Sequence, residues 1–363
     1  MKIAIISDLT YPPFFGGIEL RNYNFAKELA KRGNEVHLFG IKIWQGDSIF
    51  KKEGIIYHGI EIEKVNVNKR GTIRTINFAL NLYKELLKCD FDIIDCASIT
   101  YPACFVSRLA KKKARLVITW HQYFGNYWLE KKGFFLGSIG FLIEKLTKKI
   151  TKNNIAISDK TFRELNIKNT KIIYNGINPP LVKKSKEKED LIYIGRLTNA
   201  KNLDLLVNAI NLLKDKVSLL IIGDGPEKNH LEIKIKELHL EARIRIISNL
   251  NEEEKYKFLS SSKVFVSPSL LEGFGISCLE AMACGKPCIV IESKWNALVD
   301  LITKSQGGIV AKNNAKDFSE KIFELINNNK LREQLGKNAK AYSKNFSLEK
   351  EASKLEEYYK ILI

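Results

Sequence analysis

Residues 2–41 read KIAIISDLTYPPFFGGIELRNYNFAKELAKRGNEVHLFGI, and this stretch contains the pattern that decides the fold. The apolar run KIAIISDL is followed by a turn rich in proline and glycine. A segment with helical spacing then ends at Lys31, just before Gly33, and EVHLFGI follows it. Two short apolar strands joined through a helix form a βαβ unit with parallel strands. The stretch therefore predicts an α/β protein.

The same alternation continues along the chain. Apolar runs with helical patterns between them appear as FDIIDCAS, RLVITW, NIAIS and KIIYNG, and again as LIYIG, SLLIIGDG, RIRIIS, KVFVSPS and KPCIVI. Pro179, Pro180 and the polar run 183–190 are typical of a linker. We therefore expect two Rossmann-like, doubly wound parallel-sheet domains, residues 1–178 and 190–345. Ligands bind at the carboxyl ends of such sheets, so we expect a cleft between the two domains.

Composition sets limits on function. The chain has 363 residues and a net charge of +18. Residues 1–181 carry 29 Lys and Arg against 16 Asp and Glu, which gives +13, and the remainder carries 30 against 25, which gives +5. No apolar run reaches the 18 or more residues of a membrane span, and Asp8 interrupts the N-terminal run. We expect a cytoplasmic protein.

The six cysteines form no CxxC motif and lie in apolar contexts, which predicts reduced core thiols and no structural zinc. They are Cys89, Cys96, Cys104, Cys278, Cys284 and Cys288.

The segment 267–290, SPSLLEGFGISCLEAMACGKPCIV, carries the strongest chemical signal. It predicts a strand end, a glycine turn and a helix over 276–284 that is terminated by Gly285. Glu280 lies among apolar residues of that helix, so it needs a partner, either the hydroxyls of a ligand or a basic side chain. Two vicinal hydroxyls would suit a ribose. The backbone N–H groups of Phe274, Gly275 and Ile276 at the helix start favour phosphate. The alternative is a tight turn with Glu280 in an internal ion pair.

A second signal is LIYIGRLTNAKNLDLLVNAI, residues 191–210. Arg196 follows a strand, and Lys201 precedes a helix that begins near Asn202. A cation at a helix N-terminus opposes the helix dipole, so Lys201 suits its place only if an anion lies between it and Arg196. Such a pair neutralises a diphosphate without a metal. The alternative is two solvated surface cations.

Three other features of the sequence are weaker signals. GDGP at 223–226 lacks the third glycine of a dinucleotide fingerprint, and no GxxxxGK[ST] occurs, which disfavours a nicotinamide cofactor. Asp90 and Asp92 form a DxD, but they precede a strand start, and we expect no metal there. His121 follows the strand RLVITW at its carboxyl end, where it either contacts a substrate hydroxyl or is structural.

Residues 128–153 combine lysines with apolar side chains: WLEKKGFFLGSIGFLIEKLTKKITKN. This pattern is typical of a helix that lies on an anionic lipid surface. A helix packed on the sheet with a solvated lysine edge is the alternative. At the C-terminus, an amphipathic helix is expected from about Leu348, with Leu355, Tyr358 and Leu362 on the same face.

Taken in order, several motifs resemble the retaining nucleotide-sugar glycosyltransferases of the GT-B fold, family 4. They are YPPFFGGIE at 11–19, WH at 120–121, YNGIN at 174–178, GRLTNAKN at 195–202, GDGP at 223–226 and PSLLEGFGISCLEAMACGKP at 268–287. Glu272 and Glu280 have the E-x7-E spacing. The chain departs from the family pattern at ESKWNALVD, 292–300, and at Ser248, where glycine is frequent.

The resemblance assigns roles to these residues. Arg196 and Lys201 would hold the diphosphate, and Glu280 would hold the ribose. The sugar and the distal phosphate would be bound by the turn from Glu272 through Gly273 and Phe274 to Gly275. The base would be bordered by the segment 248–251, including Leu250. Gly16 and Gly17 would approach the donor from the first domain, and His121 would contact the transferred sugar. The residues expected to act in catalysis are His121, Glu272, Arg196 and Lys201. The helix at about 346–363 would pack back on the first domain.

The resemblance also implies an activity. It is the metal-independent transfer of a hexose, with retention, from a UDP- or GDP-sugar to a lipid-linked or cell-surface glycan acceptor, with no cofactor. The protein would act in the cytoplasm, at the inner face of the membrane if residues 128–153 touch it. Two other classes stay open, a catalytically silent protein of the same fold and a basic nucleic-acid-binding protein. The second has no helix-turn-helix, RRM or zinc signature to support it.

Overall fold

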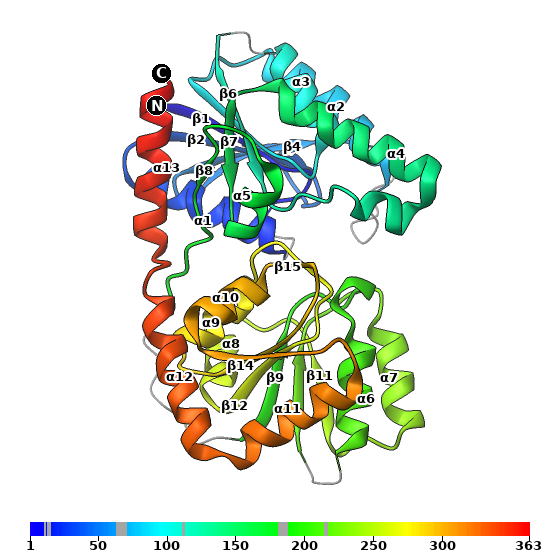
Figure 1. Ribbon diagram of the computed structural model, residues 1–363. Coiled ribbons are helices and arrows are strands. Elements are labelled where there is room, and N and C mark those ends of the chain that lie inside the picture. The colour runs from blue at the N-terminus through cyan, green and yellow to red at the C-terminus, as the bar shows by residue number, and fades with distance from the viewer. Residues whose placement is uncertain (11, 13–15, 63–70, 111–112, 181–187, 214–216) are drawn as a thin grey trace. The chain divides into compact units, whose positions relative to one another are not determined.

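The computed structural model of the chain describes residues 1–10, 12, 16–62, 71–110, 113–180, 188–213 and 217–363. Within these ranges the chain forms two compact units. The first unit comprises Met1–Gly176 with Leu348–Ile363, and the second comprises Ile177–Ser347. Each unit has one open sheet flanked by helices (Figure 1), so the predicted pair of doubly wound α/β sheets is confirmed. Most of the predicted linker, 183–187, lies outside the described residues.

The first sheet has eight strands, all parallel to their neighbours except for one hairpin. In spatial order they are β3 (Ile49–Lys52), β4 (Ile55–Ile60), β2 (Glu35–Ile41), β1 (Lys2–Ile6), β5 (Ile93–Ala97), β6 (Arg115–Trp120), β7 (Asn153–Ala156) and β8 (Lys171–Ile172). The hairpin β3–β4 was not predicted. Its two turn residues, Glu53 and Gly54, both have positive φ, of 50° and 81°, which is the turn geometry that suits a twisted hairpin.

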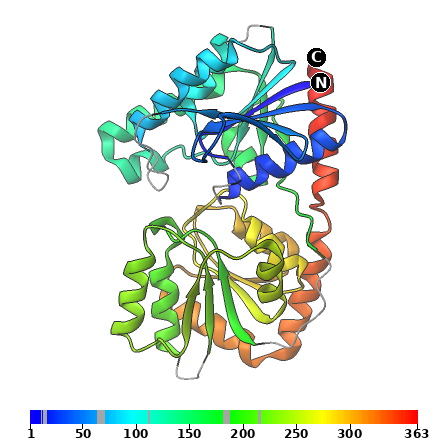
Figure 2. The same ribbon diagram turned by 180° about the vertical axis from the view of Figure 1, so that it is seen from behind.

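Alternate residues of β1 face the two sides of this sheet. Ile3 and Ile5 pack against α1 (Gly17–Lys31) and α13 (Leu348–Leu362), whereas Ala4 and Ile6 pack against α2 (Thr72–Leu86) and α3 (Tyr101–Ala110). Helix α4 (Tyr127–Ile150) packs beside α3, and α5 (Asp159–Leu165) lies against β7. Figure 2 shows the same layers from behind. A sheet buried on both faces explains why its strands are continuous apolar runs.

The predicted C-terminal helix is confirmed as α13, and it belongs to the first unit. Leu348, Leu355 and Tyr358 are buried, and Leu362 is half-buried against the same cluster. The Tyr359 hydroxyl donates to Oδ2 of the buried Asp95 at 2.5 Å. The apolar face therefore has a polar anchor that the hydrophobic pattern does not show.

The second sheet has six parallel strands. The second and third strands along the chain lie on one side of the first strand, and the fourth, fifth and sixth lie on its other side, so the direction of strand order reverses between the first and the fourth. The spatial order is β11 (Ile244–Ile247), β10 (Leu219–Ile222), β9 (Glu189–Ile194), β12 (Ser262–Ser267), β14 (Cys288–Ile291) and β16 (Gly308–Ala311). The two-stranded pair β13 (Leu271–Glu272) and β15 (Trp295–Asn296) stands apart. The reversal point lies between β9 and β12, where an open α/β sheet binds its ligand.

Helices cover this second sheet as well. One group packs on the face of Leu191 and Tyr193: α6 (Leu203–Leu212), α7 (Lys228–Glu237) and α11 (Ala315–Asn327). The others contact β12, β14 or β16: α8 (Glu252–Ser260), α9 (Ile276–Ala283), α10 (Leu298–Ser305) and α12 (Asn329–Ser343).

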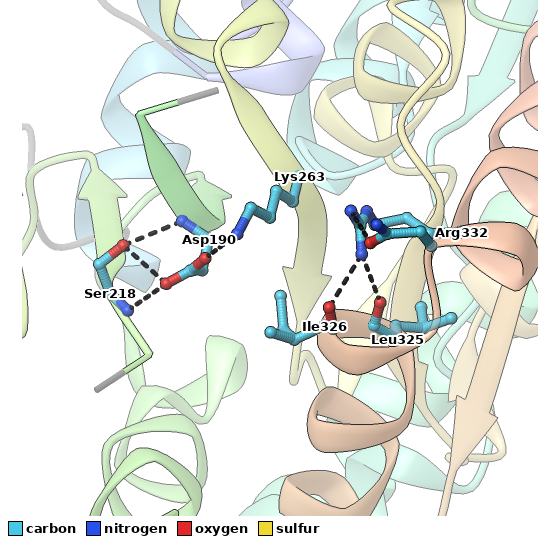
Figure 3. A network of polar contacts seen from close by, with 7 residues as sticks. Asp190, Ser218, Lys263, Leu325, Ile326 and Arg332 are labelled. Carbon is cyan, nitrogen blue, oxygen red and sulfur yellow. Dashed lines mark hydrogen bonds and ion pairs between the residues drawn. The ribbon is translucent and has the colours of Figure 1, made fainter. Parts of the chain in front are cut away.

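Polar contacts tie the amino ends of three neighbouring strands together (Figure 3). The Asp190 carboxylate on β9 accepts from the Ser218 backbone N–H, just before β10, at 2.9 Å, and from Lys263 on β12 at 2.7 Å. In the same figure, Arg332 donates to the last carbonyl oxygens of α11, at Leu325 and Ile326. The contacts of Asp190 lie at the amino ends of the strands, so they leave the carboxyl ends to the candidate site.

Candidate functional site

The residues assigned to the diphosphate and the sugar follow the carboxyl ends of β9 and β12. Arg196 comes two residues after β9 ends and is half-buried. Glu272 lies in β13, shortly after β12 ends. A backbone hydrogen bond from Leu270 N to Ala200 O, 3.0 Å, joins the two loops. The sheet reversal thus places the predicted diphosphate and sugar residues beside each other, as the topology requires.

Lys201 and Glu272 form an ion pair, with Nζ of the lysine donating to Oε2 of the glutamate. Lys201 ends a single 3₁₀ turn, Asn199–Lys201, and Asn202 then takes a left-handed conformation with φ 53°. The sequence pattern required an anion near Lys201, and the structure supplies the carboxylate of Glu272. Both side chains are only about one-fifth exposed, at 20% and 22%, so Lys201 is not a solvated surface cation.

The turn before α9 needs its second glycine. Gly275 has φ 90°, and a Cβ at this position would lie 2.1 Å from Cδ2 of Leu298. The side chain of Phe274 is buried and meets Phe346 edge to face, with ring centroids 5.8 Å apart. The predicted helix is confirmed, since α9 begins at Ile276 and Gly285 follows it with φ 74°. The buried Phe274 side chain therefore anchors the turn, and the backbone of the turn lies at the N-terminus of α9.

Glu280 is buried in α9, and its partner is a basic side chain. Nζ of Lys255 lies 2.8 Å from Oε1 of Glu280. Burial raises the pKa of Glu280 above its ordinary value, and the charge of Lys255 and a hydrogen bond from Tyr256 oppose that shift without cancelling it. The structure thus shows the internal ion pair that the sequence left as an alternative to ligand hydroxyls.

The segment expected to border the base, 248–251, is fixed at both ends. The Ser248 hydroxyl donates to the carbonyl of Gly223 at 2.8 Å, which gives a role to the serine that stands where the family often has glycine. Asn251 caps α8, because its side chain accepts from Glu254 N and the Glu254 side chain accepts from Asn251 N, both at 2.9 Å. Leu250 is half-buried between these anchors.

The glycines of GDGP serve packing. A Cβ on Gly223 would lie 2.0 Å from the carbonyl oxygen of Gly195, and one on Gly225 would lie 2.3 Å from that of Leu197. The GDGP loop therefore lies directly against the backbone that carries Arg196.

In the first unit, His121 is buried directly after β6. The loop that follows it is held by Glu144 of α4, a fully buried carboxylate. Glu144 accepts from the backbone N–H of Phe124 at 2.9 Å and of Gly125 at 2.7 Å, and from the Tyr101 hydroxyl at 2.7 Å. Sequence reasoning did not identify Glu144 as an anchor.

Gly16 precedes α1 with extended backbone, and Gly17 is the first residue of that helix. Residues 11 and 13–15 of the motif YPPFFGGIE lie outside the described residues. Gly16, Gly17 and His121 belong to the first unit, and the other candidate residues belong to the second.

Helix α4 exposes large apolar side chains. Phe134 is 77% exposed and Phe135 is 84% exposed, and Leu136, Ile139 and Leu142 are exposed as well. Gly133, with φ 71°, interrupts the helix just before them. A helix packed on the sheet would bury these side chains, so the packed alternative describes only the face of α4 that carries Gly137, Glu144 and Thr147.

Other predicted features have structural explanations. Asp92 of the DxD motif accepts from the backbone N–H of Lys2 at 2.7 Å, and no group of three or more metal-ligating side chains occurs among the described residues. All six cysteines are free thiols. In the described part of the chain, no helix has both the length and the apolar character needed to cross a membrane.

Comparisons with known proteins agree with this architecture. The model of "Glycosyl transferases group 1" matches residues 178–342, and that of "Glycosyltransferase Family 4" matches residues 15–180. An uncharacterized glycosyltransferase of Methanocaldococcus jannaschii is 30% identical, and the alignment covers 96% of this chain and 95% of that protein.

Two further similarities concern a lipid-linked substrate and the fold. The chain is 26% identical to an N-acetylgalactosamine-N,N'-diacetylbacillosaminyl-diphospho-undecaprenol 4-alpha-N-acetylgalactosaminyltransferase of Campylobacter jejuni. The alignment covers 80% of this chain and 82% of that protein. The structure of sucrose-phosphate synthase from Thermosynechococcus elongatus superposes with a TM-score of 0.85, covering 99% of this chain and 98% of that one at 19% identity. The second likeness shows the fold.

Proposed function

The chain belongs to the group 1 glycosyltransferases of family 4 and has their GT-B fold, and from this premise we propose that it moves a hexose, with retention, from a UDP- or GDP-sugar to a lipid-linked or cell-surface glycan acceptor. The observation that carries the proposal is the convergence of Arg196, the Lys201–Glu272 pair and the N-terminus of α9 at the reversal point of the second sheet. Two cations and a helix start are a suitable site for a diphosphate.

The donor would rearrange the Lys201–Glu272 pair. In the structure the two charges neutralise each other. A bound diphosphate gives Lys201 a second anion, and Glu272 then becomes available to accept hydrogen bonds from the hydroxyls of the sugar. Glu280 would take the vicinal hydroxyls of the ribose, Leu250 would border the base, and Gly273, Phe274, Gly275 and Ile276 would offer backbone.

The chemistry is a substitution at the anomeric carbon. The bond from this carbon to the diphosphate oxygen breaks, and an acceptor oxygen forms the new bond on the same face. The acceptor's proton passes to the departing phosphate. Arg196, Lys201 and the start of α9 stabilise the charge that grows on the leaving group, with no metal needed. His121 would contact the sugar near its reacting carbon, and Gly16 and Gly17 would approach the donor.

One experiment tests the donor half of this proposal. Thermal unfolding is measured with a panel of UDP-, GDP- and ADP-sugars, and nucleotide release is then followed with the best donor, with and without EDTA. A ligand at 100 times its Kd adds about 2.7 kcal/mol of stability. We expect one nucleotide class to raise Tm, Lys201→Ala to remove that rise, and EDTA to change nothing. A silent protein of this fold would bind without releasing nucleotide, and a metal-dependent enzyme would stop in EDTA.

The acceptor half rests on α4 and on a relative. The exposed Phe134 and Phe135 lie on the same helix as Lys145, Lys148 and Lys149, and apolar side chains next to cations suit an anionic lipid surface. The Campylobacter relative is named for a diphospho-undecaprenol substrate. We therefore propose contact with the inner face of the membrane through residues 128–153.

Flotation with vesicles of anionic lipid tests this contact. The wild-type protein should float at low salt and stay in solution at high salt, because salt screens the attraction. Lys→Glu changes at 145, 148 and 149 should abolish flotation. The matched control reverses three lysines of the second unit, at 236, 257 and 321, and should float normally. Equal flotation of both triple variants would remove α4 from the proposal.

A further inference from the structure

Lys255 holds the carboxylate that we assign to the ribose. It lies on α8, and its Nζ is 2.8 Å from Oε1 of Glu280 and 2.9 Å from both carboxylate oxygens of Glu252. Its side chain is 12% exposed and that of Glu280 is 5% exposed. Glu252, by contrast, is 57% exposed. The ammonium group therefore bridges a buried carboxylate and a surface one.

The position of Lys255 is set by the segment that we assign to the base. Asn251 closes that segment and caps α8 through the capping box with Glu254, which fixes the first turn of the helix and with it residue 255. Nζ of Lys255 also lies 5.0 Å from the ring centroid of Tyr256, whose side chain helps to lower the pKa of Glu280 against the effect of burial. One short helix thus presents two side chains to Glu280, directly after the loop that would border the base.

Charge explains why Lys255 stays a cation at this buried place. Burial alone would lower its pKa, but the carboxylates of Glu280 and Glu252 raise the pKa above its ordinary value. A fixed cation on one oxygen of Glu280 limits the rotation of the carboxylate. It also opposes the rise in the pKa of Glu280 that burial causes, and so favours the ionised form that accepts hydrogen bonds.

We propose that Lys255 is a positioning residue, which orients the Glu280 carboxylate toward the vicinal hydroxyls of the ribose and so gives the site its preference for ribonucleotides over 2′-deoxyribonucleotides. The inference rests on the proposed donor site, and it adds a specificity determinant that lies outside the E-x7-E motif. A purely structural ion pair between α8 and α9 would change stability and leave this preference unchanged.

Calorimetric titration of the full chain with UDP, 2′-deoxy-UDP, GDP and 2′-deoxy-GDP tests the inference. The wild-type protein should bind the ribonucleotide of its preferred base about tenfold or more tightly than the 2′-deoxy form, since the missing hydroxyl leaves Glu280 short of a donor. Lys255→Met should reduce that ratio to about twofold or less, chiefly because the variant binds the ribonucleotide more weakly. Lys255→Gln, whose amide can still donate to Glu280, should keep an intermediate ratio.

The matched control is Lys257→Met. Lys257 lies on the same helix in an exposed ion pair with Glu253, 2.8 Å apart, and its replacement should leave the ratio unchanged. An unaltered ratio in Lys255→Met would overturn the inference. If Lys255→Met fails to fold, Lys255→Gln decides: a wild-type ratio in that variant overturns the inference equally.

The donor assignment fails separately. Absence of binding by all four nucleotides to the wild-type protein, or unchanged UDP and GDP binding in Glu280→Ala, would contradict the proposed function itself. Loss of binding in Glu280→Ala together with a normal ratio in Lys255→Met would contradict only the role of Lys255.

Discussion

Glu144 in the first unit and Glu280 in the second are both buried carboxylates on helices, and burial raises the pKa of each. Their partners differ in kind. Glu144 accepts from two backbone N–H groups and the Tyr101 hydroxyl, all within 2.9 Å. Glu280 is held by the side chain of Lys255, whose Nζ lies 2.8 Å from Oε1 of the carboxylate.

The difference separates a structural carboxylate from one that can serve a ligand. Backbone donors are fixed by the fold, so Glu144 is committed to the loop after His121. A side-chain partner on one carboxylate oxygen, as Lys255 is on Oε1 of Glu280, can leave the other oxygen to a ligand, and Lys255 is itself held by Glu252. Glu280 also lies in a helix whose N-terminus meets the Lys201–Glu272 pair. We therefore expect substitutions of the two glutamates to give opposite results.

The largest effect is expected from Glu280→Ala. Loss of two charge-assisted hydrogen bonds to the ribose should lower kcat/KM about 100- to 1000-fold. The fold should survive, because Lys255 keeps its pair with Glu252. Transfer is measured by nucleotide release, and Tm by fluorimetry. An unchanged kcat/KM would remove Glu280 from the donor site.

Glu144→Ala should do the reverse. It leaves the Tyr101 hydroxyl and two backbone N–H groups without their acceptor, and buried groups left in that way cost about 1–3 kcal/mol each, partly recovered by water. We expect a loss of about 2–3 kcal/mol, seen as a lower Tm. Nucleotide affinity should stay at the wild-type value, because the partners of Glu144, namely Tyr101, Phe124 and Gly125, are not among the residues that we assign to the nucleotide. A stable variant with weaker nucleotide binding would refute this division of roles.

This comparison also shows how far the sequence leads. The central strands of both sheets, the glycine turn and α9 follow from apolar periodicity and backbone chemistry, which are local and can be read from neighbouring residues. The partners of the site residues join positions distant in the chain, such as 201 with 272 and 255 with 280. Lys255 has the i, i+3 spacing to Glu252 of an ordinary surface pair, so local reasoning gave no reason to single it out.

The polar anchors of the first unit could not be predicted from the sequence for the same reason. Glu144 lies in a lysine-rich stretch that predicts either a lipid-facing helix or a helix packed on the sheet with a solvated lysine edge, and only the tertiary structure shows that Glu144 itself is on the buried face of α4. Asp95 is a charge within an apolar strand, and its partner Tyr359 is 264 residues away. The hydrophobic pattern of α13 predicted the helix correctly but not this bond.

Tyr359→Phe tests that polar anchor with a smaller expected effect. The substitution removes a hydrogen bond to Asp95 while keeping the buried ring, and the Thr119 hydroxyl continues to donate to the carboxylate, with Oγ1 2.7 Å from Oδ1 and 2.9 Å from Oδ2. Hydrogen bonds to charged groups contribute about 1.5–3 kcal/mol, and we expect the lower figure here. Urea unfolding measures the loss. Tyr358→Phe is the control, and equal stability of the two variants would contradict the anchor.

The smallest effect concerns pH and again separates the two units. The three histidines of the first unit, His37, His58 and His121, are buried, whereas His230 and His239 of the second are exposed. Burial, aided by nearby charges, lowers the pKa of His58 to about 4 in the folded state.

In the unfolded chain, His58 therefore binds a proton near pH 6.5, whereas in the folded chain it does so only near pH 4. The free energy of unfolding is therefore highest above pH 6.5 and falls as the pH drops toward 4. Between pH 7.5 and 6 we expect a loss of less than about 1 kcal/mol. His58→Gln should flatten this slope. The glutamine amide does not titrate, and it would replace the His58 ring nitrogen that lies 2.7 Å from His37. His239→Asn, in the second unit, should keep the wild-type slope, and an equally flattened slope in that control would show that the pH dependence does not arise from His58.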